Sequence, residues 1–290
     1  MNLGKTKAAM WVEEPTGDFL KVGFRADKVL FSGKSEFQSV DVIETRGHGK
    51  MLLNDGLVML TERDEFIYHD MITHVPMFTH SNPKSVLVIG GGDGGTAREV
   101  LRHKGVESVV MVEIDGMVVD ACKEFIPQTA SDLSNPKLEL IIGDGVDYVA
   151  TTKKKFDVVI VDSTDPIGPA TPLFGTEFYQ NIKNILNDDG IVVSQAESPF
   201  YFADTQQSLL GIIGELFPVA TIYNFNNMGY PGGFWSFTFA SKGPHPTKDF
   251  KASRVKDSGL DFGYYNEDIH HAAFCLPSFQ KRKLAEKIKG

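Results

Sequence analysis

The chain has 290 residues, 42% of them hydrophobic and 23% charged, which is enough for one large core or for a large domain with a small one. The formal net charge of −9 disfavours nucleic acid or an anionic membrane surface as the main partner. Cys122 and Cys275 lack CxxC or Cys/His spacing, so neither a disulfide framework nor structural zinc is expected. No apolar stretch has the length of a signal-peptide core or of a membrane-spanning helix, and we therefore expect a cytoplasmic protein.

The first 61 residues are predicted to form a small antiparallel β domain. Short β-prone runs alternate there with turn signals, and Asn54-Asp55-Gly56 is a strong mark of a hairpin. The candidate strands cover residues 19–24, 28–31, 39–44, 50–53 and 57–60.

Residues 62–290 are predicted to form a second, larger domain. Apolar positions recur at helical spacing from Phe66 to Val75. Apolar strand runs then alternate with helices, at residues 85–89, 108–114, 138–142, 156–161 and 191–194, and residues 219–225 and 235–240 suit a terminal hairpin. Strands that are apolar throughout belong to a parallel sheet covered on both faces. The predicted fold class is α/β, a Rossmann-like doubly wound, mostly parallel sheet like that of S-adenosylmethionine-dependent methyltransferases.

A glycine-rich loop follows the first of these strands and opens a helix. Within it Gly90, Gly92 and Gly95 satisfy the pattern G-x-G-x-x-G, and Glu113 ends the next strand about twenty residues later. In such a setting the glycines let the backbone approach a nucleotide, and the acidic residue accepts hydrogen bonds from ribose hydroxyls. The pattern alone fits a dinucleotide, an adenosyl-sulfonium compound or a tight structural turn.

Two aspartates narrow the choice of nucleotide. Asp144-Gly145 follows the third strand, where a carboxylate can accept the exocyclic amine of adenine, although Asp144 is also a preferred N-cap for the short helix behind it. Asp93 lies inside the glycine loop, where its charge would repel a pyrophosphate or a carboxylate and attract an ammonium. The loop therefore favours decarboxylated S-adenosylmethionine over NAD or intact S-adenosylmethionine.

A second acidic segment follows the fourth strand. Asp162 and Asp165 lie in the run Asp162-Ser163-Thr164-Asp165-Pro166, and both should face the crevice at the carboxyl ends of the strands. A divalent metal site is disfavoured because no His or third carboxylate follows at useful spacing, and an Asx-turn is the alternative role for Asp165. Carboxylates together with Tyr and Trp side chains suit an aliphatic diamine. His270-His271 receives no role.

Taken together, these segments resemble the spermidine synthases, the polyamine aminopropyltransferase family. The resemblance runs from about Trp11 to Trp235 and rests on the segments at residues 61–66, 90–95, 112–115, 143–145 and 162–169. It implies a small N-terminal β domain on a Rossmann-like catalytic domain, a homodimer or homotetramer, and no metal. It also implies synthesis of spermidine from putrescine and decarboxylated S-adenosylmethionine, which is a co-substrate, so that no cofactor is expected.

The resemblance further implies a role for individual residues. Asp162, helped by the Tyr68 hydroxyl, would accept the proton of the amine. The nucleotide would be held by Gln38, Gly90, Gly92, Asp93, Glu113, Asp144, Gly145 and Pro169. The amine would be bound by His69, Asp93, Asp162, Asp165, Gln195, Tyr230 and Trp235.

Other functions are less favoured but stay open. An S-adenosylmethionine-dependent methyltransferase would share the sheet and Glu113, but Asp93 and the aspartates at 162 and 165 speak against it. For an NAD-dependent oxidoreductase, no Ser/Tyr set for hydride transfer stands out. A catalytically silent polyamine-binding module would be expected to have lost Asp162 or Tyr68. Within the family, cadaverine or agmatine could replace putrescine as the acceptor.

Overall fold

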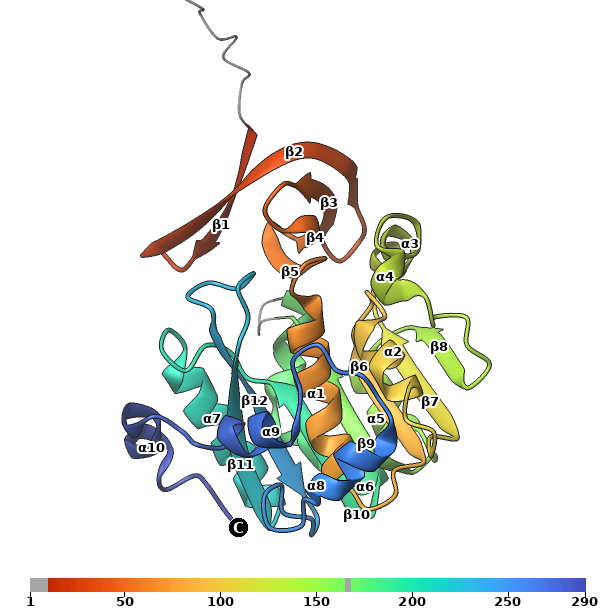
Figure 1. Cartoon of the computed structure of the whole chain (residues 1–290), viewed down its shortest axis with the longest axis vertical. Helices are drawn as coiled ribbons and strands as arrows, with labels where there is room; N and C mark the ends of the chain where they lie inside the picture. Colours follow the sequence, from red (N-terminus) through yellow and green to blue (C-terminus); the bar gives the residue numbers. More distant parts are fainter. Residues whose placement is uncertain (1–9, 165–167) are drawn as a thin grey trace, which may run out of the picture.

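Two β-sheets organise the chain in the computed structural model, which describes residues 10–164 and 168–290 (Figure 1). The first is a five-stranded antiparallel sheet with its strands in chain order. Its strands are β1 (Met10–Thr16), β2 (Leu20–Lys34), β3 (Ser39–Thr45), β4 (Gly49–Asn54) and β5 (Leu57–Thr61). The predicted hairpin between the last two is present, with Asp55 and Gly56 at positive φ of 50° and 81°, as its tight turn requires.

The beginning of this sheet differs from the prediction. Residues 20–24 and 28–31 of the two predicted strands are parts of one long strand, β2, whose register against β3 shifts at two irregularities, and residue 19 lies in the turn before it. Such bulges let one strand bend without ending, which is why the sequence reads as two short runs. Strand β1 was not predicted, because Glu13, Glu14 and Pro15 have low β-propensity; pairing with β2 holds it in the sheet.

The second sheet has seven strands in the order β11-β12-β10-β9-β6-β7-β8. The five strands from β10 to β8 are parallel, and β12 lies antiparallel between β10 and β11. The strands are β6 (Ser85–Gly90), β7 (Ser108–Glu113), β8 (Leu138–Ile142), β9 (Phe156–Asp162), β10 (Leu186–Gln195), β11 (Val219–Asn226) and β12 (Phe234–Ser241). The fold class predicted from the sequence is confirmed.

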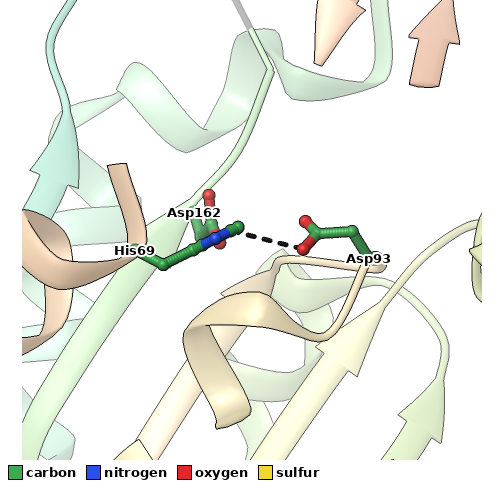
Figure 2. Close-up of side chains that lie close together, drawn as sticks. All are labelled: His69, Asp93 and Asp162. Atoms are coloured by element: carbon green, nitrogen blue, oxygen red, sulfur yellow. Dashed lines mark ion pairs between the residues drawn. The ribbon is translucent and has the colours of Figure 1, made fainter. Parts of the chain in front are cut away.

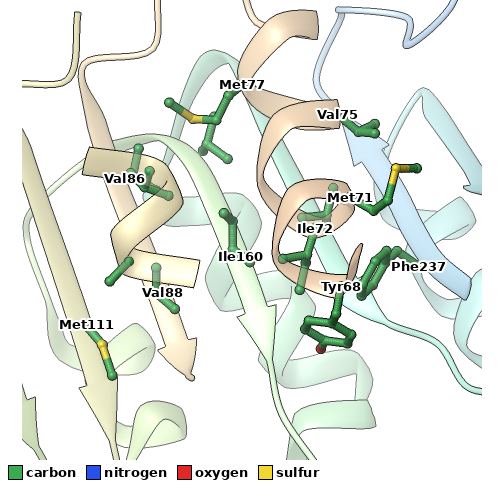
Figure 3. Close-up of a cluster of buried hydrophobic side chains, with 14 of the residues drawn as sticks. Tyr68, Met71, Ile72, Val75, Met77, Val86, Val88, Met111, Ile160 and Phe237 are labelled. Atoms are coloured by element: carbon green, nitrogen blue, oxygen red, sulfur yellow. The ribbon is translucent and has the colours of Figure 1, made fainter. Parts of the chain in front are cut away.

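Helices cover both faces of this sheet. Along β6, Val86 and Val88 belong to one buried cluster, whereas Leu87 and Ile89 belong to another on the opposite face. Figure 3 shows the first cluster, to which α1 contributes. The helices are α1 (Glu65–Thr79), α2 (Gly95–Leu101), α3 (Gly116–Phe125), α4 (Pro127–Ala130), α5 (Gly145–Thr151), α6 (Thr176–Ile185), α7 (Ala203–Leu216), α8 (Ala252–Ser258), α9 (Glu267–Ala273), α10 (Ser278–Leu284) and the 3₁₀-helix η1 (Gly168–Phe174).

The link between the sheets is short and fixed. Asp64 accepts hydrogen bonds from the Thr61 hydroxyl at 2.5 Å and from the backbone N–H of Gly229 at 2.7 Å. Apolar side chains of β3, β4 and β5 join the same buried cluster as α1. The five-stranded sheet is therefore held over the carboxyl ends of the parallel strands (Figure 1).

Two further features of the described residues bear on the predictions. His270 is buried, and its ring nitrogens lie 2.8 Å from the Tyr265 hydroxyl and 2.7 Å from the carbonyl oxygen of Pro246. This histidine therefore serves the packing of the C-terminal segment. Within residues 10–164 and 168–290, no helix combines the length and the apolar character needed to cross a bilayer.

Candidate active site

A cavity of about 320 Å³ lies between the two sheets. Every residue predicted to bind a substrate whose side chain the structure describes lines it: Gln38, Tyr68, His69, Gly90, Gly92, Asp93, Glu113, Asp144, Gly145, Asp162, Gln195, Tyr230 and Trp235. Asp165 lies outside the described residues, so its role stays a prediction. Pro169 lies in η1, its side chain lies outside the described part of the structure, and its role also stays a prediction.

The side chains follow the order of the strands along the edge of the sheet. Trp235 is the second residue of β12, Gln195 ends β10 and Asp162 ends β9. Beyond the glycine loop after β6, Glu113 ends β7 and Asp144 follows β8. Because β12 is antiparallel to its neighbours, its first residues and the last residues of the others meet at one edge. Asp162 consequently lies between two parts of the cavity. One part is lined by Trp235 and other aromatic rings, and the other is formed by the glycine loop, Glu113 and Asp144.

The end of β6 approaches β9 so closely that only glycine fits. Gly90 has a positive φ of 82°, and a Cβ atom there would lie 2.1 Å from the carbonyl oxygen of Asp162. The next N–H, that of Gly91, donates to the same oxygen at 2.9 Å. A substitution at Gly90 would be strained by its backbone conformation and would push Asp162 away.

Glu113 and Gln38 are fixed through Asp115, which lies just beyond β7. The backbone N–H of Asp115 donates to Glu113 Oε1 at 2.9 Å, and Gln38 Nε2 donates to Asp115 Oδ2 at 3.0 Å. Burial raises the pKa of Glu113 to about 7, a rise that the charges of Asp115 and Asp162 support and the hydrogen bonds from backbone N–H groups oppose. Its carboxyl group therefore titrates near neutral pH in the ligand-free protein.

Asp144 accepts the N–H of Val146 through Oδ1 at 2.7 Å and so caps α5. The N-cap role considered for this residue is confirmed. Its role toward adenine stays a prediction, and the two roles are compatible because a carboxylate accepts several hydrogen bonds.

Two hydroxyl groups hold the carboxylate of Asp162. The Tyr68 hydroxyl donates to Oδ1 at 2.8 Å, and the Thr96 hydroxyl donates to Oδ2 at 2.6 Å. Burial and the nearby charge of Asp93 raise the pKa of Asp162, whereas His69 and the two hydroxyls lower it. Burial and the charge of Asp162 raise the pKa of Tyr68 well above its ordinary value, so Tyr68 stays protonated and donates.

His69 lies between the carboxylates of Glu65 and Asp93. Its Nδ1 is 2.5 Å from Glu65 Oε2, and its Nε2 is 3.3 Å from Asp93 Oδ1, the ion pair that Figure 2 shows. The ring packs directly on Gly95, where a Cβ atom would lie 2.2 Å from His69 Cε1. Burial alone would lower the pKa of His69, but the charges and hydrogen bonds of Asp93 and Glu65 outweigh it and raise the pKa to about 10.

The argument against a metal site from sequence spacing was wrong, because α1 supplies a histidine. Ligand atoms of His69, Asp93 and Asp162 all lie within 4.8 Å of one another (Figure 2). Both ring nitrogens of His69 face carboxylate oxygens, and a ring protonated on both nitrogens, which the raised pKa of His69 favours, offers no lone pair to a metal. His69 would therefore have to lose a proton before this cluster could hold a metal ion.

Aromatic rings line the other half of the cavity. The ring centroids of Tyr68 and Tyr230 are 5.9 Å apart, and those of Tyr230 and Trp235 are 4.9 Å apart. The Tyr230 hydroxyl donates to the carbonyl oxygen of Met59 at 2.8 Å. At the same end Gln195 Nε2 donates to Glu197 Oε1 at 3.3 Å. The faces of the three aromatic rings can cover the methylene groups of an aliphatic amine.

Comparisons with known proteins identify the family. Residues 65–252, more than half of the chain, match the family model of the spermine/spermidine synthase domain. The chain belongs to the spermine/spermidine synthase family. Residues 10–62 in addition match the spermidine synthase tetramerisation domain. The resemblance and the enzyme class predicted from the sequence, polyamine aminopropyltransferase, are confirmed.

Family members align with the chain over almost its whole length. The polyamine aminopropyltransferase of Methanocaldococcus jannaschii is 46% identical over 287 residues, covering 98% of each chain. That of Alkaliphilus oremlandii is 45% identical over 280 residues, 96% of this chain and 99% of the relative. A crystal structure of spermidine synthase with the transition-state analogue AdoDATO has a TM-score of 0.94 at 42% identity and covers 96% of this chain and 95% of its own. Spermidine synthase from Thermotoga maritima has a TM-score of 0.90 at 41% identity, covering 95% and 94%.

The sequence analysis overlooked three residues of the site. Thr96 directly follows the glycine loop, and Glu65 lies one helical turn before His69, so loop position and i,i+4 spacing could have indicated both. Glu14 lines the cavity from β1 and is buried. No signal indicated Glu14, because the strand that carries it was not predicted.

Proposed function

We propose that this family member transfers the aminopropyl group of decarboxylated S-adenosylmethionine to putrescine, which gives spermidine and 5′-methylthioadenosine. The observation that carries the proposal is the position of the Asp162 carboxylate between the two halves of one cavity. A nucleotide fits the half with Glu113 and Asp144, and a diamine fits the half with Tyr230 and Trp235. The relatives' names and the complex of a spermidine synthase with AdoDATO also support it.

The reaction is a displacement at the carbon next to the sulfonium. The amine nitrogen forms a bond to this carbon, the carbon–sulfur bond breaks, and its electron pair leaves with the sulfur of methylthioadenosine. An alkyl ammonium has a pKa of ~10, so its lone pair is mostly protonated at neutral pH. Asp162, oriented by Tyr68 and Thr96, takes the proton, and such a base accelerates a reaction by about 10²–10⁴-fold. The bound geometry supplies much of the remaining acceleration.

The other predicted residues bind the two substrates in this proposal. Glu113 accepts hydrogen bonds from the ribose hydroxyls, and Asp144 accepts the adenine amine. Asp93 pairs with the aminopropyl ammonium and repels the carboxylate of intact S-adenosylmethionine. Neither a metal nor a cofactor takes part, because the sulfonium is already a good leaving group.

One assay tests the proposal and its rivals. Decarboxylated S-adenosylmethionine is incubated with putrescine, cadaverine or agmatine, and released methylthioadenosine and the polyamine product are measured. We expect the fastest release with putrescine. Faster release with agmatine or cadaverine would show that this amine, and not putrescine, is the preferred acceptor. Methyl transfer from intact S-adenosylmethionine without aminopropyl transfer would show that the protein is a methyltransferase.

Assembly is the second part of the proposal. We propose a homodimer or homotetramer formed through the domain of residues 1–61, with residues 62–290 as the catalytic domain. Residues 10–62 match a tetramerisation domain, and Trp11 and Phe19 are 58% and 60% exposed, which is typical of a surface that a partner covers. Light scattering should give two or four times the chain mass of 32.0 kDa; a monomer would contradict this part alone.

A further inference from the structure

An ion pair at the edge of the cavity joins α1 to α2. Glu65, on the first turn of α1, accepts hydrogen bonds from Arg98 Nη1 at 3.0 Å and Nη2 at 2.9 Å, and from Gln128 Nε2 at 2.7 Å. Burial would raise the pKa of Glu65, but the hydrogen bonds and charges of His69 and Arg98 bring it well below its usual range. Glu65 is therefore an anion at neutral pH, and its two hydrogen bonds with the Arg98 guanidinium fix its position.

The geometry of His69 then determines the charge of its ring. Glu65 Oε2 lies 2.5 Å from Nδ1, and Asp93 Oδ1 lies 3.3 Å from Nε2. A neutral imidazole has only one N–H group and would turn a lone pair toward one of these carboxylates. Both contacts are favourable only when both nitrogens carry a proton. The ring between Glu65 and Asp93 is thus an imidazolium cation.

This cation is isolated among acidic groups. Among the described residues that line the cavity, His69 is the only basic side chain. The acidic residues and tyrosines that face the same space come from several different strands, helices and loops and are Glu14, Asp55, Glu65, Tyr68, Asp93, Glu113, Asp144, Asp162 and Tyr230. The charge of Asp93 favours protonation of Asp162, and the charge of His69 opposes it.

We propose that Glu65, backed by Arg98, holds His69 as a cation whose charge keeps the Asp162 carboxylate ionised and able to accept a proton at neutral pH. Glu65 is a positioning residue in this inference, since it acts through His69. The inference rests on the proposed function in one respect, the use of Asp162 as the base. Without the cation, Asp162 would share a buried site with Asp93 and would hold a proton of its own at neutral pH.

The first experiment measures the charge of His69 without any substrate. Histidine labelled with ¹³C and ¹⁵N is incorporated, and the His69 ring signal is assigned by its absence in His69→Gln. In the wild type the ring should stay protonated up to a pH of about 9, whereas in Glu65→Gln it should be mostly neutral from about pH 6 upward, the range in which the acidic limb of activity is measured. Glu99→Gln is the matched control, because Glu99 also pairs with Arg98, through Oε1 and Nε at 2.9 Å, but its described hydrogen bonds and ion pairs do not include His69.

The second experiment measures turnover against pH with both substrates saturating. In Glu65→Gln the acidic limb of the pH–rate profile should move to a pH about one unit higher or more, as expected for the loss of a unit charge a few ångströms from Asp162. The maximal turnover on the plateau above this limb should stay within about threefold of wild type. The limb of Glu99→Gln should stay in place. The double variant Glu65→Gln/His69→Gln should have the limb of Glu65→Gln, since the cation is absent from both.

Three outcomes would overturn the inference. These are a wild-type His69 that is neutral at pH 7, an equal loss of turnover at all pH values in Glu65→Gln, and a limb in the double variant that moves well beyond that of Glu65→Gln. The equal loss would mean that Glu65 only supports the packing of α1 against α2. If the wild type released no methylthioadenosine, the proposed function would fail, whereas the NMR titration would still decide the charge of His69.

Discussion

Replacing Asp93 by Asn tests how the site chooses between two adenosyl compounds that differ by one carboxylate. Asp93 lies in the glycine loop, where its Oδ1 accepts the N–H of Gly95 at 2.8 Å and faces His69 Nε2 at 3.3 Å. Asn keeps the shape and an acceptor oxygen for Gly95, so the loop should keep its conformation. Only the charge is removed.

The magnitude follows from Coulomb's law and from the neighbouring cation. Two unit charges ~4 Å apart repel by roughly 4 kcal/mol at an effective dielectric constant of ~20, about three powers of ten in affinity. The imidazolium of His69 offsets part of this repulsion, and relaxation of water and side chains offsets more. We therefore expect Asp93→Asn to bind intact S-adenosylmethionine about tenfold more tightly. It should bind the decarboxylated form more weakly by about 1.5–3 kcal/mol, the usual contribution of a hydrogen bond to a charged group.

The assay is calorimetric titration of both compounds, in one buffer, into wild type, Asp93→Asn and Asp144→Asn. Selectivity is a ratio of two dissociation constants, so both must be measured for each protein. Asp144 lies after β8, at the side of the cavity assigned to adenine, and its replacement should weaken both compounds equally. If Asp93→Asn leaves the ratio unchanged, the carboxylate is excluded by shape, and the assigned role of Asp93 is wrong.

The remaining predictions concern the base, the nucleotide site and metals. Asp162→Asn should lower turnover by at least ~10²-fold with little change in methylthioadenosine binding; turnover within about threefold of wild type would refute its role. The pKa of Glu113 is raised to about 7, and a ribose hydroxyl donates best to its ionised form. Methylthioadenosine affinity should therefore be lost as the pH falls through about 7 and gained as it rises, whereas Glu113→Gln should bind weakly at all these pH values; a pH-independent wild type would contradict this. Thr96→Val, which removes the 2.6 Å hydrogen bond to Asp162, should lower turnover by about tenfold, as compared with Thr238→Val, a buried threonine of β12. Exhaustive chelation should leave the rate unchanged, and activity restored by magnesium or manganese would revive a metal site.

The sequence predicted the larger sheet well because its strands are buried on both faces. Runs such as Val86 to Ile89 are apolar at every position, and only a covered parallel sheet requires this. In such a sheet the strand ends meet at one edge. Residues as far apart as Asp93, Glu113 and Asp162 could therefore be assigned to one site before any distance was known.

The N-terminal sheet was harder to predict, for a physical reason. Its strands are partly exposed and interrupted by charged residues, so local propensity carries little information there. β1 is defined by its pairing with β2 and not by its own composition. The loss of β1 from the prediction also removed Glu14 from the list of candidate residues.

The electrostatics of the site depend on contacts that spacing alone does not give. His69 was predicted to touch the amine, which stays a prediction, and the structure in addition pairs it with Glu65 and Asp93. The search for metal ligands in the residues after Asp162 found no histidine, because His69 lies on α1, more than ninety residues earlier in the sequence. Motifs indicate which side chains share a cavity, whereas the protonation of each one depends on all its neighbours at once.

The charge balance of the cavity is consistent with the chemistry proposed for it. Asp93 and Asp162 carry two negative charges and His69 one positive charge, and Glu65 is neutralised separately by Arg98. The donor brings a sulfonium and an ammonium, and the diamine brings a second ammonium at its far end. The sulfonium loses its charge when the carbon–sulfur bond breaks, while a positive charge forms on the attacking nitrogen and its proton passes to Asp162. A site with fewer carboxylates would bind these cations poorly. Without the His69 cation, Asp162 would already hold a proton when the amine binds and could not accept another.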